Sequence, residues 1–130
     1  MNEPYEFYLK SADYVRARMP FQPELAVILG SSLGPFAAEV QNRTEIAYAD
    51  IPNFPRCTVA DHAGKLIFGE LADKKLVCLS GRFHSYEGYD FEQLTQPVRL
   101  LKLLGVRAAI LTNAAGGVNL IYRPGDVMVI

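Results

Sequence analysis

The feature that most constrains the fold is a short apolar run, Leu25 to Leu29, which lies between Pro23 and Gly30. Five apolar residues without polar alternation indicate a strand that is buried on both faces, as in the sheets of α/β proteins. A second run of this kind, Ala108 to Leu111, lies far downstream. The sequence therefore predicts an α/β domain in which strands alternate with helices.

Helical and hairpin patterns surround these two runs. Apolar side chains recur every three or four residues over 5–19, which predicts an amphipathic helix with Asn2 as its cap. Asp90 and Gln93 form a capping-box pattern at the start of a helix predicted over 91–104. The other predicted elements are a helix over 35–40, a short strand over 45–48, a hairpin of strands over 65–71 and 76–79, and a last apolar run over 127–130.

Composition excludes several classes of protein. The 130 residues are 50% hydrophobic and 21% charged, so burial can offset the entropy of ordering the chain. Thirteen basic and fourteen acidic residues give a net charge of −1, which argues against nucleic acid or an anionic membrane as the main partner. No apolar run is long enough to span a membrane, and no secretory signal is recognisable. Cys57 and Cys78 form no C-x-x-C pair, so we expect a cytoplasmic protein with reduced thiols.

The first segment with chemical potential, Gly30-Ser31-Ser32-Leu33-Gly34, follows the first buried strand. Backbone N–H groups in such a turn, with a helix start behind them, can bind an anion, and a serine hydroxyl adds a donor. The same residues match the G-x-S-x-G elbow of serine hydrolases, with Ser32 as nucleophile. Asp50, Asp61 and His84 follow in the hydrolase order. However, only one predicted strand precedes Ser32, whereas the hydrolase nucleophile follows several.

The second segment, Gly81 to Tyr89, follows the predicted 76–79 strand and contains Arg82, His84 and Tyr86. Arg82 offers a planar fork of N–H donors, and His84 can donate to an anion near neutral pH. In an extended segment these three side chains project from the same side. Glu87, three residues after His84, could orient the imidazole. The pattern predicts a surface that binds an anionic ligand with a polar body.

Two further segments complete the set. Asn113-Ala114-Ala115-Gly116-Gly117 follows the second buried strand, and its small residues let the backbone approach a ligand closely. Asp61-His62-Ala63-Gly64 precedes the strand over 65–71. Because α/β sheets bind ligands beyond the carboxyl ends of their strands, we expect the segments after the strands to form one site.

Taken together, these motifs resemble the trimeric, inosine- and guanosine-cleaving class of purine nucleoside phosphorylases. The resemblance covers essentially the whole chain. Its most specific motifs are Gly81-Arg82-Phe83-His84-Ser85-Tyr86-Glu87-Gly88-Tyr89 and Asn113-Ala114-Ala115-Gly116-Gly117, supported by Val27 to Gly34, His62-Ala63-Gly64 and Pro124-Gly125-Asp126.

The resemblance implies a mixed, twisted sheet that is partly barrel-like and flanked by helices. It implies reversible phosphorolysis of purine nucleosides, with inorganic phosphate as a substrate and no metal or organic cofactor. Phosphate would be bound by Ser31, His62, Arg82, His84 and the Ala114 N–H, with His84 and Glu87 as the catalytic pair and Tyr86 on the ribose. The partners would be a purine nucleoside, phosphate and further copies of the chain, forming a trimer if a second half of the protein is present.

Two positions depart from the family pattern, in which glycine is usual at Ser32 and at Asp61. We expect a carboxylate at 61 either to repel phosphate or to raise the pKa of His62. The base-recognising residues of the family belong to a second half of the protein, and none can be assigned here. We therefore expect residues 1–130 to be one α/β domain that is the N-terminal half of a larger one, cut within the sheet at the apolar run over 127–130. Two alternatives remain: a non-catalytic remnant that binds phosphate or assembles with another chain, and a serine hydrolase that uses Ser32.

Overall fold

The computed structural model describes residues 3–57 and 64–130. Five strands form one mixed sheet in the order β2-β3-β4-β1-β5. The sheet is mixed, because β1 pairs in parallel with both β4 and β5, whereas β2, β3 and β4 are joined by antiparallel pairs. The bounds are β1 Leu25–Ile28, β2 Gln41–Ala47, β3 Lys65–Leu71, β4 Lys74–Ser80 and β5 Ala108–Leu111.

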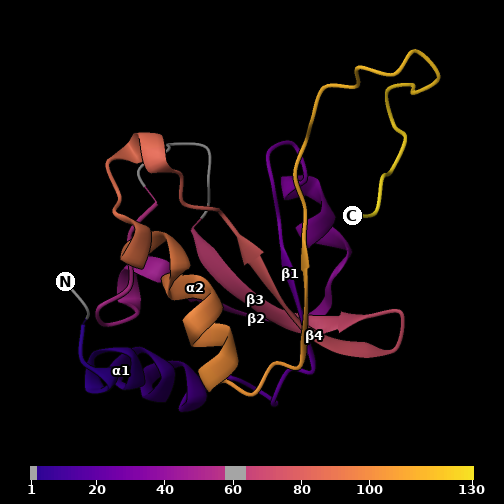
Figure 1. Ribbon diagram of the computed structural model, residues 1–130. Coiled ribbons are helices and arrows are strands. Elements are labelled where there is room, and N and C mark those ends of the chain that lie inside the picture. Colours follow the sequence, from indigo (N-terminus) through magenta and orange to yellow (C-terminus); the bar gives the residue numbers. More distant parts are fainter. Residues whose placement is uncertain (1–2, 58–63) are drawn as a thin grey trace.

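Helices cover both faces of this sheet (Figure 1). Helices α1 and α2 lie on one face, and the 3-10 helix η1 lies on the other. Two shorter 3-10 helices, η2 and η3, lie in the connections. The bounds are α1 Tyr5–Arg16, α2 Phe91–Leu103, η1 Gly34–Glu39, η2 Tyr48–Asp50 and η3 Ser85–Glu87. The predicted fold class, a mixed sheet flanked by helices, is confirmed. The sheet is open, with β2 and β5 at its edges, so these five strands do not form the barrel-like closure.

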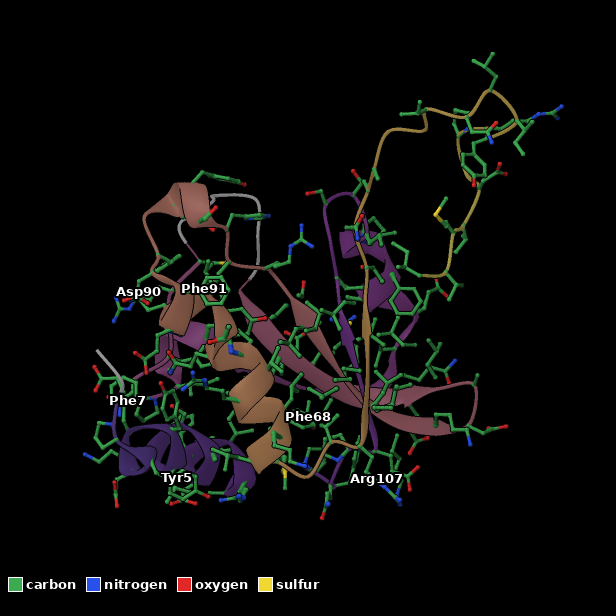
Figure 2. The ribbon with its side chains drawn as sticks, viewed as in Figure 1. Tyr5, Phe7, Phe68, Asp90, Phe91 and Arg107 are labelled. Atoms are coloured by element: carbon green, nitrogen blue, oxygen red, sulfur yellow. The ribbon has the colours of Figure 1, made fainter. Side chains whose placement is uncertain are left out.

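Alternation along the strands gives the sheet a hydrophobic core on each face. In β1, Ala26 and Ile28 face α1 and α2, whereas Val27 faces η1. Phe68 of β3 is fully buried between the sheet and α2 (Figure 2). Because both faces of β1 are covered, its apolar residues have no polar alternation, as the sequence predicted.

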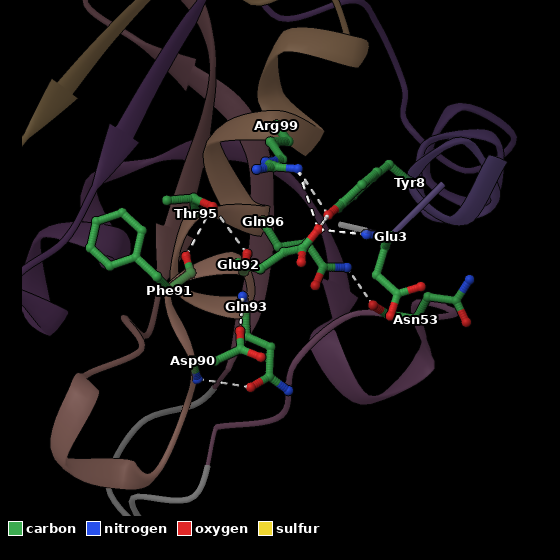
Figure 3. A network of polar contacts seen from close by, with 10 residues as sticks. All are labelled: Glu3, Tyr8, Asn53, Asp90, Phe91, Glu92, Gln93, Thr95, Gln96 and Arg99. Carbon is green, nitrogen blue, oxygen red and sulfur yellow. Dashed lines mark hydrogen bonds and ion pairs between the residues drawn. The ribbon is translucent and has the colours of Figure 1, made fainter. Parts of the chain in front are cut away.

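Helices α1 and α2 are joined by polar contacts as well as by apolar ones (Figure 3). Glu92 accepts hydrogen bonds from the Tyr8 hydroxyl and from the Glu3 N–H, the latter at 2.8 Å. Arg99 donates to the Tyr8 hydroxyl at 2.9 Å. The pKa of Glu92 is lowered, chiefly because its carboxylate accepts the hydrogen bond from Tyr8. Asp90 caps α2 as predicted, accepting from the Gln93 N–H at 2.8 Å.

Several predicted boundaries were wrong. The first helix starts after Pro4, which occupies the N-cap position, and Asn2 lies outside the described residues. The helix predicted over 35–40 is the 3-10 helix η1, and β2 begins at Gln41, four residues before the predicted start. Residues 127–130 form no strand, and they are exposed.

The largest discrepancy concerns β5. The sequence predicted a strand buried on both faces, and the strand is present at the predicted residues. All four of its residues are nevertheless exposed, because β5 lies at the edge of the sheet and the segment after it runs away from the body of the chain (Figure 1). In the described part of the chain, no helix is long and apolar enough to cross a membrane.

Candidate active site

Three of the segments singled out in the sequence follow the carboxyl ends of neighbouring strands of the sheet. Strands β4, β1 and β5 are neighbours and run parallel, so their carboxyl ends lie side by side. Gly81 to Tyr89 follows β4, Gly30 to Gly34 follows β1, and Asn113 to Gly117 follows β5. The strand order thus places these three segments at the carboxyl ends of neighbouring strands, where α/β sheets bind ligands.

The ends of β1 and β5 are in close contact. The Gly30 N–H donates to the Thr112 Oγ1 at 2.9 Å. A Cβ at position 30 would lie 2.5 Å from the Thr112 carbonyl oxygen and 2.9 Å from the Asn113 Cα, which is too close for any other residue. Gly30 is therefore required for the approach of the two strand ends rather than for an unusual backbone angle.

The end of β4 joins the same junction through Arg82. Its Nη1 donates to the Thr112 carbonyl oxygen at 3.2 Å. The neighbouring Phe83 is buried in an aromatic cluster with Tyr48, Phe54 and Tyr89, with ring centroids 5.5 to 5.8 Å from its own. Burial of Phe83 anchors the segment that carries Arg82 and His84, because an aromatic side chain contributes a large buried area.

His84 and Glu87 form the predicted pair. Glu87 accepts from the His84 N–H at 2.7 Å, and its Oε2 lies 3.3 Å from the His84 Nδ1. The Glu87 side chain is 3% exposed and that of His84 is 18% exposed, so the carboxylate lies behind the imidazole. A carboxylate at Nδ1 fixes that nitrogen as the protonated one, which leaves Nε2 as the second position for contact with a ligand.

Tyr86 lies over the imidazole of His84. The two rings stack with centroids 4.7 Å apart and planes 17° from parallel, and Tyr86 is 76% exposed. The sequence predicted that the two side chains share a side, but the reason given was wrong. Tyr86 is in the 3-10 turn η3 rather than in an extended segment, and this turn brings it onto His84.

The serines of the first segment differ in backbone conformation. Ser31 and Ser32 are both exposed in the turn that the Leu33 N–H closes by donating to the Gly30 carbonyl at 3.3 Å. Ser32 has a φ of 69°, in the left-handed region that favours glycine. Beside this turn is a hollow of about 510 Å³, lined by Leu29, Gly30, Ser32, Gly34, Pro35, Ala37, Ala38, Arg43, Lys65, Ile67, Ser80 and Gly81.

The remaining predicted site residues are placed less fully. Ala114 is exposed in the segment after β5. His62 and Asp61 lie outside the described residues. The residues that flank them, Cys57 and Gly64, both lie against Gly81, with a Cβ placed on Gly81 3.0 Å from the Cys57 Sγ and 3.2 Å from the Gly64 Cα.

Two residues at these strand ends were not found from the sequence. The buried Tyr48 hydroxyl donates to the Gly81 carbonyl at 2.9 Å across 33 residues of sequence, and burial raises its pKa well above the ordinary value. Thr112, which directly precedes the Asn113 to Gly117 segment, accepts hydrogen bonds from Gly30 and Arg82 and so holds the junction of the three strand ends. No local pattern marks either residue, because their partners are distant in the sequence. Among the described residues, no group of three or more His, Cys, Asp or Glu could hold a metal ion.

Comparisons with known proteins agree with this geometry. The model of the phosphorylase superfamily matches residues 24–130. Purine nucleoside phosphorylase 1 of Geobacillus stearothermophilus is 49% identical over 121 residues, which are 93% of this chain and 44% of that protein. The purine nucleoside phosphorylase of Rattus norvegicus is 45% identical over 126 residues, 97% of this chain and 44% of that protein.

A solved structure, isoform 2 of the purine nucleoside phosphorylase of Schistosoma mansoni in complex with cytosine and ribose-1-phosphate, has a TM-score of 0.85 at 43% identity. The match covers 94% of this chain and 43% of that one. The chain thus spans less than half the length of the relatives that it matches. Because the family model covers most of the sequence and solved relatives have the same fold, the chain belongs to the phosphorylase superfamily.

Proposed function

We propose that the protein is a purine nucleoside phosphorylase. It would convert a purine nucleoside and inorganic phosphate reversibly into the free purine and ribose 1-phosphate. This chain would supply the phosphate-binding part and some of the ribose-binding part of the site. The observation that carries the proposal is that the carboxyl ends of β4, β1 and β5 lie side by side. There Arg82, after β4, and Gly30, after β1, both bond to Thr112, after β5.

Each residue at these strand ends has a proposed role. Ser31, Arg82, His84 and the Ala114 N–H bind the phosphate dianion, and His62 is proposed as a further phosphate-binding residue. Tyr86, stacked on His84, contacts the ribose. Glu87 orients His84 through its Nδ1 and N–H.

The chemistry follows from holding the dianion beside the anomeric carbon. A phosphate oxygen forms the new bond to that carbon while the glycosidic C–N bond breaks, and the purine leaves with the electron pair and takes up a proton. The ribose carries positive charge in the transition state, which the adjacent anion stabilises. The reaction needs no metal or organic cofactor.

The setting of the enzyme is part of the proposal. The net charge of −1 supports small-molecule substrates rather than nucleic acid. Two cysteines that form no C-x-x-C pair support a cytoplasmic location. We propose that residues 1–130 are part of a larger α/β domain and that the whole protein is a homo-oligomer, a trimer if it has a second half. The 44% coverage of the relatives supports the larger domain.

Inosine cleavage with and without phosphate tests the function. We expect the whole protein, with its base-binding part, to release hypoxanthine only with phosphate. We expect Arg82→Ala to weaken phosphate binding by about 10- to 100-fold, because charge-assisted hydrogen bonds contribute about 1.5–3 kcal/mol. Arg107→Ala is the matched control, because Arg107 is exposed at the opposite end of β5 (Figure 2). Equal effects of the two substitutions would contradict the assignment.

Phosphate-binding and ester-hydrolysis measurements separate the two alternatives. Phosphate binding without turnover would indicate a non-catalytic member of the superfamily, which the partial coverage of the relatives makes worth testing. Ester hydrolysis that Ser32→Ala abolishes would indicate the hydrolase, for which the positive φ of Ser32 is the supporting observation.

A further inference from the structure

We propose that Thr112 is a positioning residue of the phosphate site, which orients the Arg82 guanidinium. Its hydroxyl takes the place of its carbonyl as the acceptor for the Gly30 N–H, and the carbonyl accepts from Arg82 instead. The inference rests on the proposed function. It concerns a residue that contributes no side-chain donor to phosphate in that proposal, and that acts through Arg82 and Gly30.

The hydrogen bonds at Thr112 depart from a regular parallel ladder in one place. The Thr112 N–H donates to the Ile28 carbonyl at 3.1 Å, as the parallel pairing of β1 with β5 requires. In a regular ladder the next bond would run from the Gly30 N–H to the Thr112 carbonyl, because parallel bonds are evenly spaced along both strands. Instead, the Gly30 N–H donates to the Thr112 hydroxyl at 2.9 Å.

The hydroxyl is used in both of its roles. While it accepts from Gly30, it donates to the Ile28 carbonyl at 2.9 Å. A threonine hydroxyl has one proton to donate and lone pairs to accept, so both contacts are satisfied together. The side chain thereby replaces one rung of the ladder between β1 and β5.

The replacement releases the Thr112 carbonyl to Arg82. That carbonyl accepts from the Arg82 Nη1 at 3.2 Å, although it lies so close to Gly30 that a Cβ there would be 2.5 Å away. One N–H of the guanidinium is thus fixed by backbone, which limits the orientation of the planar fork and of its remaining donors. Without the hydroxyl, the Gly30 N–H would have to turn to the Thr112 carbonyl, so the two strand ends would have to shift to form that ladder bond and the acceptor of Arg82 would move with them.

Thr112→Val tests this, because valine keeps the branched shape and lacks the hydroxyl. We expect phosphate binding, measured by isothermal titration calorimetry with inorganic phosphate, to weaken about tenfold, the equivalent of one hydrogen bond. Thr112→Ser, which keeps the hydroxyl, should bind within about twofold of the wild type. Thr95→Val is the control, because within residues 3–57 and 64–130 the Thr95 hydroxyl bonds only to carbonyls of its own helix, at 3.0 and 3.1 Å.

Amide hydrogen exchange at Gly30 gives a second readout that does not depend on phosphate. Protection of this amide should fall in Thr112→Val and persist in Thr112→Ser, and Thr112→Ala gives the same test if the valine variant does not fold. Unchanged phosphate binding in Thr112→Val, or unchanged Gly30 exchange, would overturn the inference. If the wild type itself binds no phosphate, the proposed function fails, and the exchange data still decide whether the hydroxyl holds the junction.

Discussion

Strands β1 and β5 are similar in sequence but differ in burial. Each has four apolar residues, Leu-Ala-Val-Ile in β1 and Ala-Ala-Ile-Leu in β5, and the two pair with each other in parallel. In β1 all but the first residue are buried, whereas all of β5 is exposed. The difference arises from position, because β1 lies between β4 and β5, and β5 is at an edge. An apolar run thus indicates a strand, while its neighbours in space decide how much of it is buried.

The largest effect is expected when an isoleucine side chain is truncated to alanine in each strand. Ile28 is 7% exposed and Ile110 is 51% exposed. We expect Ile28→Ala to lower the free energy of unfolding by about 2–5 kcal/mol, because it leaves a cavity in the core. Ile110→Ala should cost less than about 1 kcal/mol, because half of its side chain already faces water. Urea unfolding of both variants measures the difference, and equal losses would show that β5 is covered in solution.

A second test adds a methyl group at the end of each strand. Gly30→Ala places a Cβ 2.5 Å from the Thr112 carbonyl, so we expect a loss of about 1–3 kcal/mol. Gly116→Ala, in the segment after β5, meets nothing within 4 Å and should change stability by less than about 0.5 kcal/mol. Thermal unfolding followed by circular dichroism compares the two. A tolerated Gly30→Ala would mean that the strand ends can separate.

A third test uses pH. Strand β5 has no titratable side chain, whereas β4, the other neighbour of β1, contains the buried thiol of Cys78. Cys78 of β4 lies opposite Val27 in the parallel register, and burial raises its pKa to about 11. A thiol with a raised pKa in the folded state stabilises the fold below pH 9 and loses this contribution as the pH rises through 11. We expect the wild type to lose on the order of 1 kcal/mol more than Cys78→Ala between pH 8 and 10.

The half-buried Cys57 supplies the control for that titration. Its pKa is also raised, first by burial and then by Glu87. Cys57→Ala retains Cys78, so it should follow the wild type more closely over the same pH range. Identical pH profiles for the wild type and Cys78→Ala would contradict the assigned burial of the thiol.

The smallest effect is expected in the turn after β1. Ser32 has a positive φ, and among the described residues after β5 only a glycine, Gly125, does. Ser32→Gly relieves this strain while giving the unfolded chain more freedom, so stability should change by less than about 0.5 kcal/mol. Ser31→Gly gains only the freedom and should cost about 0.5–1 kcal/mol. Differential scanning calorimetry resolves the two, and a larger loss in Ser32→Gly would show that its side chain holds the turn.

Much of the fold could be predicted from local patterns. The β3–β4 hairpin, the capped helix α2 and the strands β1 and β5 are all present where the sequence indicated them. The start of β2 was missed, because Gln41 to Arg43 are polar and exposed at an edge strand. The burial of β5 was overestimated, because strand order depends on pairings that no local pattern records.

The site could be predicted in its parts but not in its connections. Arg82, His84 and Glu87 were recognised from their spacing, and the contact of His84 with Glu87 is local in sequence. The bonds from Arg82 and Gly30 to Thr112 span 30 and 82 residues. Such contacts depend on strand order, so Thr112 could not be identified as their common partner.

The strand order also determines when during synthesis the sheet can be completed. Strand β1 emerges early, but Leu25 pairs with Leu76 and with Ala108, which are translated much later. The β3–β4 hairpin closes through Ala72 and Asp73 alone, so it can form as soon as it leaves the ribosome. Strand β1 therefore lacks β4 until residue 80 has been translated, and it lacks β5 until residue 111. Until then the apolar residues of β1 have neither sheet neighbour, and transiently exposed apolar surface of this kind favours aggregation.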